Sequence, residues 1–285
     1  PDGSHLLGNE VLNGAIALIL ITCVVSSIVT ERASRRMALH EMEAAEPETS
    51  DGERVLISVS NPNTLFELVS LAVLIRDSKN TDNVIAVNVV SDSDNRNVAR
   101  SARQGKRFLE MAAQAASGSG MTLKTVSRYS ADVATGVIHT AKEQEATTII
   151  LGIHRKLTAA DSHSGPYSEA FLSRLHREVV MIKMLMPFNT LRRIVVAVPP
   201  KAQFEPGFSK WMNHVLKVGR TLGCQIHFHC SHETAMFVRL IVDRQGYSDK
   251  VRIEQMDSWD EFMMLSASVN YDHLLIAAAS RPGGV

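Results

Sequence analysis

The sequence predicts an α/β fold built twice, as two tandem parallel-sheet units that follow one apolar N-terminal helix. Short apolar, β-branched runs alternate with amphipathic stretches from Arg54 onward, which is typical of a parallel sheet covered by helices on both faces. The order of runs then repeats, since RIVVAV at 193–198 matches RVLISV at 54–59. An uncharged run at 11–30 precedes both units.

Length and composition indicate a folded protein. The 285 residues, 45% of them apolar and 21% charged, correspond to one large or two small domains and exclude a disordered or collagen-like chain. Lys and Arg together balance Asp and Glu at 30 each, so no net positive field exists to hold nucleic acid. The three cysteines are too few and too scattered for a disulfide framework, which fits a reducing compartment. They are Cys23, Cys224 and Cys230.

The uncharged run, Val11–Thr30, has the length of a membrane-spanning helix, because at ~1.5 Å per residue it covers the ~30 Å of hydrocarbon. By the positive-inside bias, the arginines that follow place the chain after about residue 31 in the cytoplasm. These are Arg32, Arg35 and Arg36. A signal peptide fits less well, since acidic residues precede the run and no small-x-small cleavage site follows it. A buried or dimer-forming helix of a soluble protein is the other alternative. Because the sequence starts without Met, we expect the span to be the last of a longer membrane protein.

An acidic segment separates this run from the α/β units. Turn-forming residues accompany the acids, and we expect a solvated connector that anionic lipid repels and that holds the soluble part off the membrane face. We therefore assign residues 1–52 to the membrane helix and its linker. The acidic residues between Arg36 and Arg54 are Glu41, Glu43, Glu46, Glu48, Asp51 and Glu53.

The first α/β unit is predicted at 53–190. Its helix 64–77 is apolar over most of its circumference, so we expect it to lie between the sheet and the second unit, or at a subunit interface. The last strand, 179–186, is expected to leave an unpaired edge and so to be a second candidate interface. Strands are predicted at 55–60, 83–90, 121–129, 147–152 and 179–186, and helices at 64–77, 95–116, after the cap Asp132, and at 167–177.

The second unit, at 191–285, repeats the first up to its fourth strand. It lacks the last helix and fifth strand of the first copy, either because the polypeptide was cut or because the natural tail is minimal. Strands are predicted at 193–198, 224–230, 251–256 and 272–277, and helices at 208–222, 233–244 and 258–267.

Two stretches resemble known families. Asp132–Gly152 (DVATGVIHTAKEQEATTIILG) resembles the core of the universal stress protein family, and the five-strand order and tandem duplication fit that family. Gly8–Leu39 (GNEVLNGAIALILITCVVSSIVTERASRRMAL) is similar to the last membrane helix of bacterial monovalent cation:proton antiporter-2 proteins, of the sodium/hydrogen exchanger superfamily. Some of those transporters carry paired universal-stress-type domains after that helix. The order of apolar span, acidic linker and two α/β repeats is a more specific indication of this resemblance than either stretch alone.

The resemblance implies where a nucleotide would bind. ATP-binding members of the stress family use an Asp at the end of strand one and a Gly-x2-Gly-x9-Gly-Ser/Thr loop after strand four. Here Ser60 ends strand one, Gly152 and Gly165 stand at the first and third glycines, and Arg155 replaces the second. Pro166 replaces the Ser/Thr and donates no backbone N–H. These positions leave three interpretations open: ATP bound in the family manner, a different anionic or adenine-containing ligand in the same cleft, or a pocket without a ligand that is kept for packing. Arg155 could clamp a phosphate or simply fill the pocket.

Other chemistry has weaker support. His227 and His229 share one strand face at a spacing that can hold a metal, with His232 as a candidate third ligand, but no clear acidic or cysteine cluster accompanies them. The ordinary interpretation is polar residues on a partly exposed strand. His154 and His163 flank the loop after strand four and fit loop solvation. The sequence holds no Walker loop, nucleophile elbow or His-Glu-x-x-His motif, so we expect no enzyme, catalytic residue or metal site.

Together the resemblances imply the C-terminal cytosolic regulatory part of a sodium- or potassium/proton antiporter in the cell inner membrane, with transport carried out by upstream helices. Implied partners are the antiporter's own membrane domain, the membrane through 11–30, a second copy in a homodimer and a small anionic or nucleotide ligand, but not nucleic acid. The alternatives are a soluble tandem universal stress protein that binds ATP or another adenine nucleotide, and a dimerisation module without a ligand.

Overall fold

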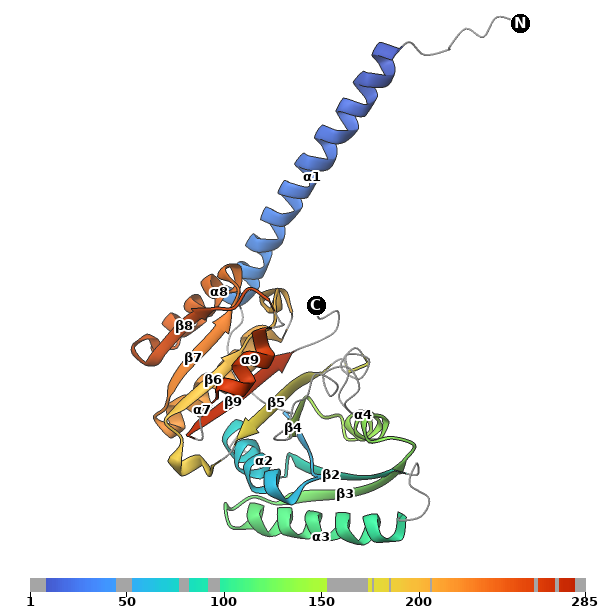
Figure 1. Cartoon of the computed structure of the whole chain (residues 1–285), viewed down its shortest axis with the longest axis vertical. Coiled ribbons are helices and arrows are strands. Elements are labelled where there is room, and N and C mark those ends of the chain that lie inside the picture. The colour runs from blue at the N-terminus through green and yellow to red at the C-terminus, as the bar shows by residue number, and fades with distance from the viewer. Residues whose placement is uncertain are drawn as a thin grey trace, which may run out of the picture. The chain divides into compact units, whose positions relative to one another are not determined.

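The structure of the chain is a computed structural model (Figure 1). It describes residues 9–44, 53–76, 82–91, 98–152, 174–175, 177–184, 186–205, 207–258, 261–269 and 272–279. Contacts divide the chain into an N-terminal unit, Pro1–Pro47, and a body, Glu48–Val285, and each is described by itself.

The N-terminal unit contains one long helix, α1 (Asn9–Ala44). Its segment Val11–Thr30 is long and apolar enough to cross a membrane, and none of it is buried. The hydroxyl of Thr22 donates to the carbonyl of Leu18 at 2.9 Å, so this polar side chain is satisfied within the helix. The predicted apolar helix is confirmed, but it continues to Ala44, into the segment expected to be a connector. Ala, Leu, Met and Glu dominate residues 37–44, and all are strong helix formers.

The body begins with the predicted alternation of strands and helices. Asn61 caps α2 by accepting from the Asn63 amide at 2.9 Å, and Asp132 caps α4 by accepting from the Thr135 amide at 2.8 Å. The predicted helix 167–177 lies mostly outside the described residues. The elements of the first half are β1 (Val55–Ser58), α2 (Pro62–Ile75), β2 (Val84–Ser91), α3 (Val98–Ser117), β3 (Leu123–Ser130), α4 (Val133–Glu143), β4 (Thr148–Gly152) and β5 (Glu178–Met184).

The second half repeats this order, as predicted. Gly223 ends its first long helix in the left-handed region, with φ of 68°, where a glycine carries no steric penalty. The elements are η1 (Phe188–Thr190), β6 (Arg193–Ala197), η2 (Ala202–Phe204), α7 (Phe208–Leu222), β7 (Gln225–Cys230), α8 (His232–Arg244), η3 (Ser248–Lys250), β8 (Val251–Gln255), α9 (Glu261–Ser268) and β9 (His273–Ala279).

The nine strands within the described residues form one sheet, in the order β3-β2-β1-β4-β5-β9-β6-β7-β8. Neighbours pair in parallel except β5 and β9, which are antiparallel. Counted from the β3 edge, the first half contributes its third, second, first, fourth and fifth strands (β3, β2, β1, β4 and β5). Counted from the β8 edge, the second half contributes its third, second, first and fourth strands (β8, β7, β6 and β9). β5 therefore lies beside the fourth strand of both halves, so one strand occupies the fifth position for each.

The expectation of an unpaired edge at 179–186 is wrong. β5 lies inside the sheet, where it pairs with β4 on one side and with β9 on the other, from Val179 opposite Ala279 to Met184 opposite Leu274. The edges of the described sheet are β3 and β8. β9, like β4, has backbone N–H and C=O groups on one side that need a partner strand. β5 pairs with both strands and so leaves neither of its own sides unpaired.

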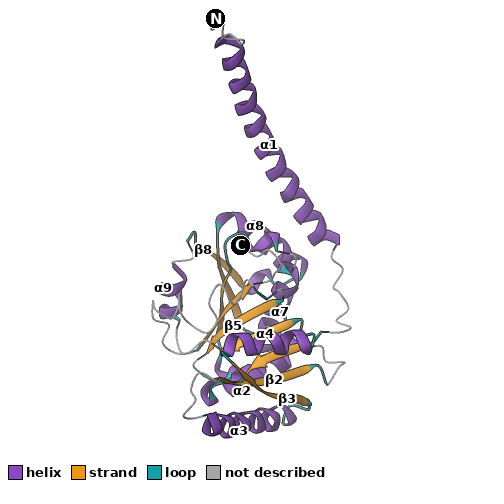
Figure 2. Cartoon of the chain, turned by 90° about the vertical axis from the view of Figure 1, so that its right-hand side faces the viewer, coloured by secondary structure: helices purple, strands orange, loops and turns teal. Residues whose placement is uncertain are grey.

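Helices cover both faces of the sheet (Figure 2). α3 approaches Asn88 through Gly105 and α4 approaches Val89 through Gly136, and consecutive strand residues point to opposite faces. α3 and α4 therefore lie on opposite faces of β2. Met181 of β5 packs against the apolar cores of both halves.

The apolar helix predicted at 64–77 does lie between the sheet and the second half. α2 contacts β1, β4 and α3 within its own half and α7 of the other half. Its side chains Leu65, Leu68 and Leu71 are fully or almost fully buried. α7 carries buried Phe208 and Trp211, whose rings meet edge to face with centroids 5.2 Å apart. The contact between α2 and α7 therefore joins the two halves beside the shared sheet.

Candidate functional site

Of the predicted nucleotide positions, the structure describes two, Ser60 and Gly152. Ser60 is exposed just after β1, and Gly152 ends β4, the strand paired with β1, so both lie at the carboxyl edge of the sheet. A Cβ on Gly152 would lie 3.2 Å from the hydroxyl of Thr64, so α2 packs closely there. Arg155 and Gly165 lie outside the described residues. Nucleotide binding thus stays a prediction, with a hydroxyl at Ser60 where the family carboxylate would be.

The predicted histidine pair has a carboxylate neighbour that the sequence did not reveal. Glu254 of the adjacent strand β8 has one oxygen 3.1 Å from Nδ1 of His227 and the other 3.8 Å from Nε2 of His229. Burial, followed by the charge of Arg193, lowers the pKa of His227, so its ring is neutral near pH 7. His232 begins α8 and is exposed. Arg193 and Arg252 both act on His227, and these positive charges oppose a cation at this place.

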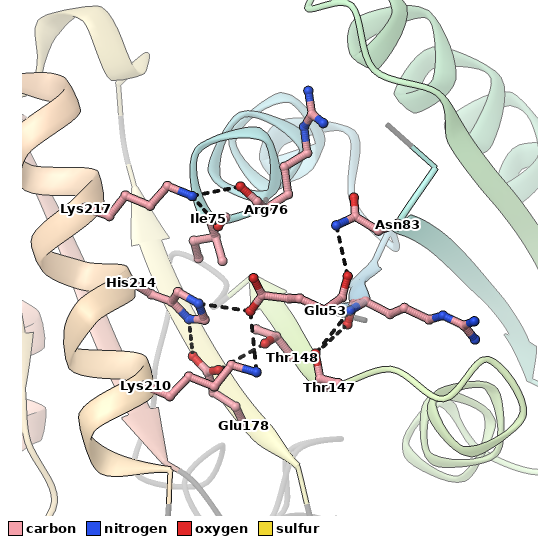
Figure 3. A network of polar contacts seen from close by, with 11 residues as sticks. Glu53, Ile75, Arg76, Asn83, Thr147, Thr148, Glu178, Lys210, His214 and Lys217 are labelled. Atoms are coloured by element: carbon pink, nitrogen blue, oxygen red, sulfur yellow. Dashed lines mark hydrogen bonds and ion pairs between the residues drawn. The ribbon is translucent and has the colours of Figure 1, made fainter. Parts of the chain in front are cut away.

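A different cluster, absent from the sequence predictions, joins the two halves of the body (Figure 3). Lys210, His214 and Lys217 follow one another at intervals of four and three residues, which places them on one face of α7. All three contact groups of the first half, as Figure 3 shows. The face of α7 that meets the first half is therefore basic.

His214 lies between two glutamates. Its Nε2 atom is 2.9 Å from Oε1 of Glu53, and its Nδ1 atom is 2.9 Å from Oε1 of Glu178. The three side chains are 11%, 5% and 4% exposed. Glu53 stands two residues before β1, and Glu178 is the first residue of β5. We call Glu53, Glu178 and His214 the inter-repeat triad.

The surrounding groups satisfy the triad unequally. The hydroxyl of Thr148 donates to Oε2 of Glu178 at 3.0 Å, so Glu178 has a second, neutral partner. Glu53 has Lys210 as its second partner, with Nζ 3.5 Å from Oε1. The backbone carbonyl of Glu53 accepts from Nδ2 of Asn83 at 2.9 Å. Glu178 is thus held within the sheet, while the Glu53 carboxylate depends on α7.

Lys217 adds a second contact between α7 and the first half. Its Nζ atom donates to the carbonyls of Ile75 at 2.9 Å and of Arg76 at 2.8 Å. These carbonyls end α2, where the last carbonyls of a helix lack internal partners and carry partial negative charge. Lys217 therefore caps α2 from the other half of the body.

The two carboxylates keep His214 in its charged form. Burial alone would lower the pKa of His214, but the charges and hydrogen bonds of Glu178 and Glu53 outweigh it and raise the pKa to about 9. Burial raises the pKa of Glu53, but His214 and Lys210 outweigh it, so this pKa lies below its usual value. At neutral pH the site therefore contains an imidazolium whose two N–H groups face two carboxylates.

One possible ligand atom from each of these three residues lies within 4.8 Å of the others, which is the spacing at which a metal ion has to be considered. In this arrangement each ring nitrogen faces a carboxylate oxygen, and the ammonium of Lys210 lies beside Glu53. A metal would have to displace the imidazole proton and tolerate the lysine charge. The geometry therefore favours a proton over a metal.

Sequence reasoning missed this site for a physical reason. Glu53 stands last in a run of solvated acids, and its partner His214 lies far along the chain in the other half. The sequence offers one signal, namely the spacing of Lys210, His214 and Lys217, which places three basic side chains on one face of α7. On an ordinary surface helix such a charged face points to solvent, so the spacing alone does not reveal that this face is buried. The two glutamates are brought to it only by the order of strands in the sheet.

No protein-family model matches the sequence, and no curated protein matches it. Among solved structures, a universal stress protein from Archaeoglobus fulgidus is similar to it with a TM-score of 0.52 and 12% identity, over 79% of this chain and 96% of that one. The cytoplasmic domain of a prokaryotic cation chloride cotransporter is similar with a TM-score of 0.52 and 8% identity, over 80% of this chain and 95% of that one. The body therefore has a Rossmann-like fold of the universal stress protein type, which also occurs in the cytoplasmic domain of a transporter.

Proposed function

We propose that this chain is the cytosolic regulatory part of a membrane cation transporter, of the sodium- or potassium/proton antiporter kind, attached to its last membrane helix. One observation carries the proposal: an exposed helix long enough to span a membrane precedes, in the same chain, a tandem body with the universal stress fold. A body of this fold forms the cytoplasmic domain of the cotransporter described above.

The surface of α1 supports a lipid environment. Large apolar side chains along Val11–Val29 are between 45% and 64% exposed, among them Leu18 and Leu20. A continuous apolar surface of this length is costly in water, at about 25 cal/mol for each Å². Arg32 follows the apolar segment, which fits a cytoplasmic end.

In this proposal the chain regulates and does not transport. Upstream helices carry the ion, and the body biases the carrier by binding a ligand or proton more tightly in one of its states than in the other. The segment from Arg32 to Glu53 connects the two parts. We assign the body no catalytic reaction.

The antiporter assignment rests on the resemblance of Gly8–Leu39, and a cotransporter is the alternative that the structural similarity favours. These two classes differ in whether chloride takes part. An ATP-binding stress protein has less support, because Ser60 lacks the carboxylate that would hold the nucleoside.

The test is a transport measurement on the whole protein encoded by the reading frame upstream of Pro1. We expect that frame to contain ten or more hydrophobic spans. In everted membrane vesicles, added Na⁺ or K⁺ should collapse a preformed proton gradient, followed with a pH-sensitive dye, and replacing chloride with gluconate should leave the rate unchanged. Chloride-dependent transport would favour the cotransporter, and a gene that starts within a few codons of Pro1 would overturn the proposal.

A further inference from the structure

We propose that the inter-repeat triad is a proton-operated latch, in which protonated His214 holds Glu53, and with it the start of the body, against α7. Loss of the proton releases Glu53. The inference deepens the proposed function, because a change at Glu53 reaches a transporter only if α1 is anchored as proposed. The latch itself is a property of the body.

The position of Glu53 makes it suited to this role. It is the first described residue of the body after α1, and it precedes β1 by two residues. The next backbone amide, of Arg54, donates to the hydroxyl of Thr147 at 3.1 Å, and the amide of Val55 donates to the carbonyl of Asn83 at 2.9 Å. Glu53 therefore lies directly before the sheet in the described chain, and its side chain ties that point to the second half.

The charged groups around His214 come from several elements. Glu178 of β5 acts on it through its charge and a hydrogen bond to Nδ1, and Glu53 acts on it through its charge, with Oε1 2.9 Å from Nε2. Lys210 and Lys217 lie on its own helix, and Arg76 follows α2 in the same region (Figure 3). The other elements that contact α7 are η2, α8, β7 and β9. The ionisable groups on or next to them include Glu205 after η2, Glu233, Arg239, Asp243 and Arg244 on α8, His227 and His229 on β7, and Asp272 and His273 at the start of β9.

Deprotonation would break the triad on one side. A neutral imidazole has one N–H and one lone pair, so it can donate to only one of the two carboxylates, and its lone pair faces the other. Glu178 would keep the Thr148 hydroxyl, whereas the Glu53 carboxylate would keep, among the described residues, only Lys210 at 3.5 Å. Removing one member of a buried charge group leaves the rest uncompensated, which is strongly unfavourable. Glu53, which precedes β1 and is not part of a strand, is therefore the side that opens.

The direction of the response follows from the sign of the charge. The latch is closed while His214 is protonated and opens as the pH rises through the raised pKa of His214, which is about 9. It is thus closed at neutral pH and responds to alkaline conditions. A transporter that exchanges protons would experience such a change at its cytosolic face.

The test is hydrogen exchange of the full chain in detergent micelles, read by mass spectrometry between pH 7.5 and 10 and corrected for intrinsic exchange. In the wild type, protection of a peptide covering 53–58 should fall about tenfold or more with a midpoint near pH 9, while a peptide within α3 stays unchanged. His214→Gln should show the low protection at every pH. His139→Gln, which removes an exposed histidine of α4, should behave as wild type.

A second variant separates a latch from a merely structural contact. Glu53→Gln removes one of the two charges that stabilise the imidazolium, so the midpoint for His214, followed by NMR of its ring protons, should fall by about one pH unit or more. An unchanged midpoint in Glu53→Gln, or a wild-type pH step in His214→Gln, would overturn the proposal. Release of Glu53 on addition of Zn²⁺ or EDTA, without a response to pH, would also overturn the proposal, because that result indicates a metal site. None of these results depends on whether α1 lies in lipid, so failure of the latch and failure of the proposed function can be told apart.

Discussion

At the scale of single residues, the chemistry of His214 is set by groups that are distant in sequence. A histidine buried alone would lose its proton, but Glu53 and Glu178 reverse that tendency. The cost of burying charge is met here by pairing, with two carboxylates balanced by the imidazolium and the ammonium of Lys210. The contact is therefore stabilising over a limited range of pH.

The free energy of unfolding should reflect this range. The pKa of His214 in the folded body, about 9, lies above its unfolded value of 6.5, so the stabilisation is fully present below pH 6.5 and is lost as the pH rises through 9. Over this interval it amounts to about 3 kcal/mol, at about 1.4 kcal/mol for each pH unit. Urea unfolding at a series of pH values, read by tryptophan fluorescence, should show the wild type losing about this much more than His214→Gln. Parallel curves for the two proteins would contradict the assigned charge state.

Local residue chemistry was predictable and long-range chemistry was not. Asn61 and Asp132 act within a few residues of themselves and both cap helices, Asp132 at the position that the sequence predicts. Glu53 reads in sequence as one more solvated acid, because nothing nearby reveals that β5 and α7 enclose it. Ser60 and Gly152 lie at one sheet edge because β1 and β4 are neighbours in this topology, and their role in nucleotide binding stays a prediction.

At the scale of elements, close packing of helix on strand depends on small residues. Gly136 of α4 lies over Val89 of β2, and a Cβ there would meet the two Cγ atoms of Val89 at 2.5 and 2.8 Å. Val89 has a β-branched side chain with a stiff χ1 angle, so it cannot turn away easily. The approach of α4 to the sheet is therefore limited by this contact.

Gly136→Ala should accordingly destabilise the body by about 1–3 kcal/mol, the usual cost of overpacking a filled core. The measurement is the urea midpoint at constant slope. Gly118→Ala is the matched control, because the nearest atom to its added Cβ is a backbone oxygen 3.4 Å away at an exposed position. Equal stability of the Gly136 variant and wild type would show that α4 can move away from β2 without cost.

The existence of a strand or helix follows from its periodic apolar pattern and could be predicted. The position of a strand in the sheet depends on which strands pair and could not. Apolar runs such as Ile149–Leu151 mark buried strands whatever their neighbours. The position of β5 depends on which strand lacks a partner, which the pattern of one strand does not encode. The length of α1 was underestimated, because acidic residues after Arg36 suggest solvation without excluding a helix.

At the scale of the whole molecule, the body is one sheet to which two halves of the chain contribute strands in the same order. β5 completes the order of strands on both sides, and the basic face of α7 joins the second half to the first. A change at the triad therefore acts where the halves meet. Glu53 is the first described residue after α1 along the chain, and in our proposal the anchoring of α1 in a membrane decides whether the body can regulate a transporter.

Cys23 provides the most direct measurement of that anchoring. It lies within Val11–Thr30 and is exposed on α1, whereas Cys224 and Cys230 are buried in the body. We predict that in native membranes a membrane-impermeant maleimide does not label Cys23 until detergent and denaturant are added. Ala33→Cys, just beyond the apolar segment, should be labelled at once in opened vesicles. Rapid labelling of Cys23 in a chain that stays in the aqueous fraction would contradict the account.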